Sequence, residues 1–145
     1  MNVSVNFHGT CAEDFRYYEE HLGGRIESMR TFAETAGHSG VEPGWEDRVV
    51  HGRMSLGGVI LMGADIPTAA PMRSANLTLT PDTVEDAELV FARLSDGGEV
   101  FMPLQKTFFA TRHAQLRDRF GVNWMILHQG SMAAGDEAPT GVNVR

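Results

Sequence analysis

Two basic side chains at alternate positions, His51 and Arg53, are the first candidates for chemistry in this sequence. Residues 49 to 56 alternate in character, which predicts a half-buried strand with His51 and Arg53 on its polar face. An imidazole there could act as a general base, and a guanidinium beside it could hold an anion. A strand-face histidine can equally be a hydrogen-bonded structural residue, and both interpretations stay open.

A second candidate segment, residues 105 to 124, combines polar groups with aromatic area, as pockets for small molecules do. Arg112 could hold a carboxylate or phosphonate, or it could pair with Asp118. Phe108 and Trp124 could line a pocket or be buried core. The predicted ligand-binding residues are Arg53, Gln105, Thr107, Phe108, Arg112 and Trp124. Basic residues gather around Asp118, which predicts a salt-bridged turn or a wall for a small anion: Arg112, His113, Arg117 and Arg119.

A metal site could be built only on His8 and His51, with a third ligand that the pattern does not supply. The single cysteine, Cys11, excludes an intrachain disulfide. It falls at the start of a predicted helix, where amide dipoles lower a thiol pKa and favour a nucleophile. A small residue packed between strand and helix fits the same position.

The elements that position these residues follow one order twice. The first half has a strand at 3–8, a helix from Thr10 to Gly23-Gly24, and strands at 25–32, 49–56 and 59–62. The second half has a strand at 74–80, a helix ending at Gly97-Gly98, and strands at 99–104, 112–117 and 122–128. Thr10 with Glu13, and Thr83 with Asp86, predict capped helix starts. Residues 33–48 predict a long mobile loop, and residues 64–74 a link between the halves.

This order predicts an α+β fold of two βαβββ modules, about 1–66 and 74–128, in one domain over 1–130 with a flexible tail at 131–145. A length of 145 residues with 42% apolar content suits one core. A formal charge of −7 with only 12 Lys and Arg argues against nucleic-acid binding. No apolar run approaches the roughly 20 residues of a membrane span, so a cytoplasmic protein is expected.

Several short motifs carry a family resemblance. They are Phe7-x-Gly9-x-Cys11, Leu22-Gly23-Gly24, Leu56-Gly57-Gly58, Met102-Pro103-Leu104-Gln105-x-Thr107-Phe108 and Asp118-Arg119-Phe120-Gly121-Val122-x-Trp124-Met125. Together they resemble the PhnB-like branch of the vicinal oxygen chelate superfamily, which includes glyoxalases, bleomycin-resistance proteins and extradiol dioxygenases. Members of this branch are also named 3-demethylubiquinone-9 3-methyltransferase. The resemblance implies a cupped mixed sheet with helices outside, a homodimer and a small molecule in the cup.

The superfamily also implies a divalent metal held by His, Glu or Gln on the first and last strands of each module. The matching positions are Ser4 or Asn6, Met62, Asn76 and Met125, which are poor ligands for zinc, iron or manganese. The expectation is therefore a small-molecule-binding protein without metal or other cofactor. The alternatives are a metal-dependent lyase, isomerase or dioxygenase with His51 at its centre, and a drug-sequestering resistance protein. A methyltransferase is not expected, because the glycine pairs end helices or turn hairpins.

Overall fold

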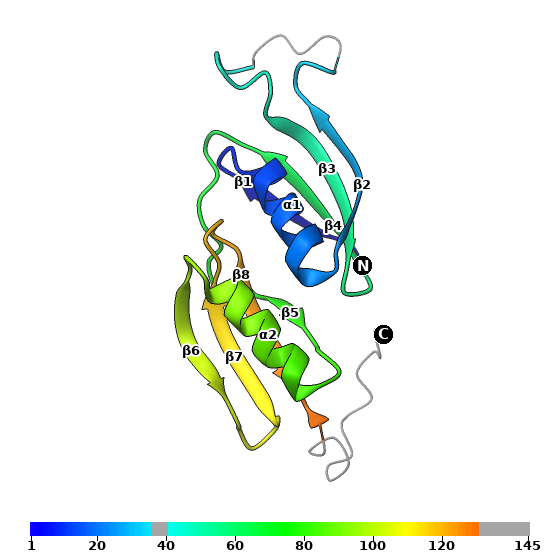
Figure 1. The fold of residues 1–145 in the computed structure, drawn as a ribbon. Coiled ribbons are helices and arrows are strands. Elements are labelled where there is room, and N and C mark those ends of the chain that lie inside the picture. The colour runs from blue at the N-terminus through cyan, green and yellow to red at the C-terminus, as the bar shows by residue number, and fades with distance from the viewer. Residues whose placement is uncertain (36–40, 131–145) are drawn as a thin grey trace. The chain divides into compact units, whose positions relative to one another are not determined.

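The computed structural model describes residues 1–35 and 41–130, in two compact units, Met1–Pro71 and Met72–Arg145 (Figure 1). The boundary between the units falls within residues 64–74, the segment predicted as a link. The predicted tail at 131–145, and part of the loop predicted at 33–48, lie outside the described residues. No helix in the described ranges is long and apolar enough to cross a membrane.

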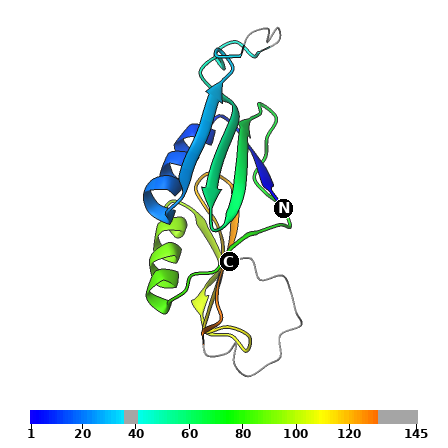
Figure 2. The same cartoon turned by 90° about the vertical axis from the view of Figure 1, so that its right-hand side faces the viewer.

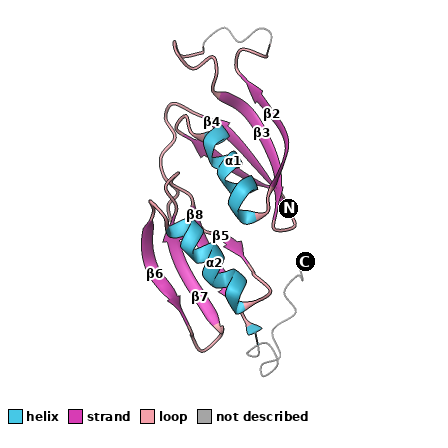
Figure 3. Ribbon diagram, viewed as in Figure 1, coloured by secondary structure: helices cyan, strands magenta, loops and turns pink. Residues whose placement is uncertain are grey.

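Unit 1 is one βαβββ module. Its elements are β1 (Val3–Phe7), α1 (Cys11–Leu22), β2 (Arg25–Thr31), β3 (Val49–Leu56) and β4 (Val59–Asp65). The four strands form sheet 1 in the order β1-β4-β3-β2, in which β1 runs parallel to β4 and the other pairs are antiparallel (Figure 3).

Unit 2 repeats the same order. Its elements are β5 (Leu77–Leu79), α2 (Val84–Ser95), β6 (Glu99–Gln105), β7 (Arg112–Arg117) and β8 (Asn123–His128). Sheet 2 has the order β5-β8-β7-β6, again with one parallel pair, β5 with β8. The predicted α+β fold of two βαβββ modules is therefore confirmed, each module being a four-stranded mixed sheet with one helix.

In each unit the helix covers one face of the sheet (Figure 2). In unit 1 this face is built around Phe15, which is fully buried. Gly52 and Gly63 lie beneath its ring, and a Cβ added at Gly63 would lie 2.8 Å from both Cys11 Sγ and the Phe15 ring. Glycine in these strands therefore lets α1 approach the sheet closely. We call the opposite surface the helix-free face of each sheet.

The two helix starts differ from each other. Thr83 caps α2 as predicted, because its hydroxyl oxygen accepts a hydrogen bond from the Asp86 N–H at 3.0 Å. The capping box predicted at Thr10 is wrong, because the Thr10 side chain makes no capping bond. Asp65, at the end of β4, accepts from the Cys11 N–H at 3.0 Å instead. A carboxylate distant in sequence thus replaces the local cap.

Candidate functional site

The helix-free face of sheet 1 concentrates positive charge on β2 and β3. His51 and Arg53 lie on it as predicted, since the residues between and beyond them, Gly52 and Met54, are buried towards α1. Register places Arg30 of β2 opposite His51. Arg25 lies opposite Ser55 on the same face. Four basic side chains therefore share two neighbouring strands in a chain whose formal net charge is −7.

One carboxylate orients this cluster. Glu27 Oε2 accepts a hydrogen bond from Arg53 Nε at 2.6 Å, and the other carboxylate oxygen lies 3.9 Å from Arg25. The side chains of Arg53 and Glu27 are 40% and 27% exposed, so their ion pair contributes at most about 1 kcal/mol to stability. What the pair fixes is the direction of the Arg53 guanidinium.

Neutral side chains flank Arg53 across the sheet. Register aligns a row across the sheet, from Ser28 on β2 through Arg53 on β3 and Met62 on β4 to Ser4 on β1. The row places Met62 beside Arg53 on one strand and Ser28 beside it on the other. Such a surface can bind an anion through charge and the rest of a small molecule through apolar contact.

His8 does not extend this cluster through any contact with His51 in the described ranges. It lies beyond the end of β1, where its ring packs edge-on against Trp45 with centroids 5.7 Å apart. Arg48 donates to the Gly9 carbonyl at 2.8 Å and lies over the Trp45 ring. His8 is therefore part of the contact between β1 and the segment before β3.

The donor set does not fit the divalent metal that the superfamily implies. Within residues 1–35 and 41–130, no three His, Cys, Asp or Glu side chains gather closely enough to hold a metal ion. Ser4 and Met62, two of the positions expected to hold the metal, lie side by side on the helix-free face of sheet 1. A hydroxyl and a thioether do not replace imidazole and carboxylate as ligands for zinc, iron or manganese.

The predicted binding residues of the second half divide between the two faces of sheet 2. Arg112 lies near α2, with Nη2 3.5 Å from Glu88 Oε1, rather than pairing with Asp118. Trp124 is buried, and its indole N–H donates to Asp118 Oδ2 at 2.8 Å. Gln105 pairs with His113, the neighbour of Arg112 along β7, and so lies on the other face of the sheet. These side chains therefore do not converge on one surface of unit 2.

The β6–β7 hairpin holds the other two predicted residues. Phe108 is 90% exposed, and its ring contacts Phe109 edge-on. The Thr107 N–H donates to the Ala110 carbonyl in the turn, while the Thr107 hydroxyl oxygen is buried and has no hydrogen-bond partner among the described residues. Phe109 in turn packs against His113, whose Nδ1 lies 3.1 Å from Met102 Sδ.

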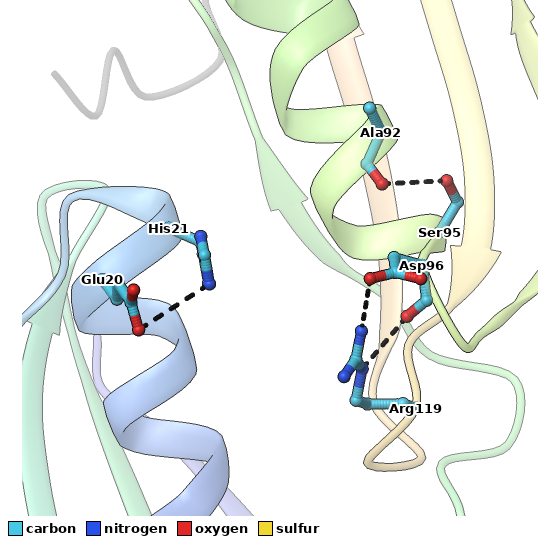
Figure 4. Close-up of polar contacts among 6 residues, drawn as sticks. All are labelled: Glu20, His21, Ala92, Ser95, Asp96 and Arg119. Carbon is cyan, nitrogen blue, oxygen red and sulfur yellow. Dashed lines mark hydrogen bonds and ion pairs between the residues drawn. The ribbon is translucent and has the colours of Figure 1, made fainter.

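Two of the basic residues around Asp118, Arg117 and Arg119, contact partners in other parts of unit 2. Figure 4 shows Arg119 at the end of α2, where Nε donates to the Asp96 carbonyl at 3.1 Å and Nη2 to its carboxylate at 2.7 Å. Arg117 donates to the Asn123 side chain and to the Met72 carbonyl, both at 2.9 Å. These guanidinium groups are engaged within unit 2.

Cys11 is a packed residue rather than an activated nucleophile. It is fully buried, and burial together with the carboxylates of Asp65 and Asp14 raises the pKa of its thiol above the ordinary 9.0. The helix start, which was expected to favour the thiolate, is outweighed by loss of solvent and by negative charge.

The sequence interpretation missed Glu27, Arg25 and Arg30. A signal was present, because Ile26 and Met29, which both face α1, are three residues apart instead of two. That spacing breaks strand alternation and indicates a β-bulge.

This chain is similar to several known proteins in sequence and in fold. The chain is 35% identical to protein PA1353 from Pseudomonas aeruginosa, whose crystal structure it matches with a TM-score of 0.77 over 89% of this chain and 96% of that one. A PhnB protein from Bacillus cereus, provisionally named 3-demethylubiquinone-9 3-methyltransferase, is 24% identical, with a TM-score of 0.74 over 88% and 98% of the chains. Protein YjdN of Escherichia coli (strain K12) is 26% identical over 138 residues, 87% of this chain and 92% of YjdN. The model of the glyoxalase/bleomycin resistance protein/dioxygenase superfamily matches residues 7–126. The chain therefore belongs to this superfamily.

Proposed function

We propose that this protein binds a small anionic molecule on the helix-free face of sheet 1, with Arg53 and His51 as its principal contacts and without a divalent metal. The observation that carries the proposal is the cluster of four basic side chains on β2 and β3. The orientation of Arg53 by Glu27 supports it further, because a fixed guanidinium loses less freedom when it binds.

The methyltransferase name of the Bacillus relative is not transferred to this chain. A platform for S-adenosylmethionine usually needs a glycine-rich turn between a strand and a helix. Here Gly23 ends α1 with a φ of 73°, and Gly57 and Gly58 turn β3 into β4 with φ values of 58° and 81°. These glycines therefore have roles in the local backbone.

A nuclear magnetic resonance titration tests the proposal, with methylphosphonate and acetate as probes. We expect saturable shifts at β2 and β3, and about a 10- to 100-fold weaker affinity in Arg53→Ala, because a charged hydrogen bond contributes roughly 1.5–3 kcal/mol. Arg73→Ala is the matched control, since Arg73 is exposed and removes the same charge from unit 2. Equal affinities in all three proteins would refute the proposal.

The same preparations test the alternatives. Metal analysis of protein purified without chelator would show stoichiometric metal if His8 and His51 served a metal-dependent lyase, isomerase or dioxygenase. Tight binding of a large cationic compound instead would favour the drug-sequestering function, which the net charge of −7 would assist. A homodimer also remains part of the proposal, and light scattering would detect it.

A further inference from the structure

Arg53 has two neighbours on β2 because that strand carries a bulge. Ile26 pairs with Met54, whereas Ser28 pairs with the adjacent residue Arg53, so Glu27 is an extra residue in β2. Bulges disrupt the ladder locally and redirect side chains, and they are frequent next to active sites. Here the bulge places both Glu27 and Ser28 beside Arg53, and the Glu27 carboxylate reaches its guanidinium.

The contact between Glu27 and Arg53 uses only one of the three guanidinium nitrogens. Arg53 Nε donates to Glu27 Oε2 at 2.6 Å. The two terminal nitrogens of Arg53 have no hydrogen-bond partner in the part of the chain that the structure describes. Two parallel N–H groups on the far edge of a guanidinium match two oxygens bonded to one atom.

We propose that Glu27 is a positioning residue that holds Arg53 for a two-oxygen anion, and that the ligand carries a carboxylate, phosphonate or phosphate group. This inference rests on the anion binding proposed above. With Nε occupied, a ligand meets the terminal nitrogens as a fixed fork instead of a mobile charge. The site then selects planar or tetrahedral oxoanions over spherical ions of equal charge.

Two effects of Glu27 have opposite signs, which makes its role measurable. Its negative charge weakens the attraction of the cluster for every anion. Its hydrogen bond to Arg53 strengthens only those contacts that need a fixed geometry. Removing Glu27 therefore strengthens the binding of a spherical anion and weakens that of an oxoanion, whereas a mere counter-charge would affect both in the same direction.

The test titrates the full chain with methylphosphonate and, separately, with iodide, and follows the Arg53 Nε–H resonance. For Glu27→Ala we expect methylphosphonate binding to weaken about 2- to 10-fold, the effect of releasing one side chain, and iodide binding to become stronger. Glu27→Gln keeps an oxygen that can accept from Nε and should retain the preference for methylphosphonate. Glu20→Ala, at an exposed position of α1, is the charge-matched control and should leave both affinities unchanged.

The possible outcomes distinguish the role of Glu27 from the existence of the anion site. If the Glu27→Ala variant binds both anions more tightly and by the same factor, Glu27 is only a counter-charge and the inference is wrong. If the unaltered protein binds methylphosphonate no better than Arg53→Ala does, the anion site itself is wrong. A displaced Arg53 Nε–H resonance in Glu27→Ala, but not in Glu27→Gln, would support positioning directly.

Discussion

Removing the carboxylate of Asp65 should strongly destabilise unit 1. It lies at the end of β4 and is only 1% exposed. One carboxylate oxygen accepts from the Cys11 N–H at 3.0 Å, and the other accepts from the Val49 N–H at 2.8 Å. A single side chain thus joins the start of α1, the start of β3 and the end of β4.

The expected loss follows from these two bonds. Replacing Asp65 with alanine leaves two buried N–H donors without an acceptor, and each costs roughly 1–3 kcal/mol. The negative charge near the N-terminus of α1 contributes about another 0.3–1 kcal/mol. We therefore expect Asp65→Ala to lower the free energy of unfolding of unit 1 by about 2–7 kcal/mol. Asp65→Asn keeps one accepting oxygen but turns an amide N–H₂ towards the second donor, so it should lose about half as much.

Amide hydrogen exchange combined with urea unfolding would measure this loss. Exchange at Cys11 and Val49 reports the local bonds, and circular dichroism reports the unfolding of the chain. Asp47→Ala is the matched control, because Asp47 is exposed in the same unit and its removal should change stability by less than about 0.5 kcal/mol. A loss below about 1 kcal/mol in Asp65→Ala, with both amides still protected, would refute the reasoning.

Two further predictions concern the packing beneath α1. Cys11 should react slowly with a disulfide reagent at pH 8 and rapidly in urea, because its pKa is raised in the folded protein; equal rates would contradict its burial. The unfolded thiol ionises near its ordinary pKa of 9.0, whereas the folded thiol stays protonated to higher pH. The free energy of unfolding should therefore fall as the pH rises above 9.0, and Cys11→Ser should make this fall smaller. Gly63→Ala should destabilise the protein by about 1–3 kcal/mol, measured by urea unfolding, because its Cβ would lie 2.8 Å from Cys11 Sγ; an unchanged midpoint would show that α1 can shift. Gly44→Ala is the contrasting variant, because apart from its chain neighbours no atom lies within 4 Å of the Cβ added there. Any loss of stability in Gly44→Ala comes from the φ of 88° at Gly44 and not from overpacking.

Most of the secondary structure could be predicted from the sequence because its signals are local. Alternation over 49–56 matches β3, and the glycine pair after Leu22 ends α1 with Gly23 in the left-handed region. Thr83 caps α2 through a residue three positions away. Each of these features depends on neighbours within a few residues, so the pattern in the chain is sufficient.

The candidate site could be predicted only in part. His51 and Arg53 share a face because alternation within one strand fixes their direction. Glu27, 26 positions before Arg53 in the sequence, reaches it through pairing between two strands, and the bulge shifts that pairing by one residue. The register between two strands depends on how they pack together, so it cannot be predicted from the sequence of either strand alone.

The sequence by itself determined the order of the elements, the helix ends and the repetition of one βαβββ module. The tertiary structure alone decided that Asp65, 54 residues from Cys11, caps α1 in place of Thr10, and that Arg112 lies against Glu88 instead of pairing with Asp118. The physical reason is the range of the interactions. Periodicity and caps act over a few residues, whereas the partner of a buried polar group is whichever one the packed chain brings within hydrogen-bonding distance.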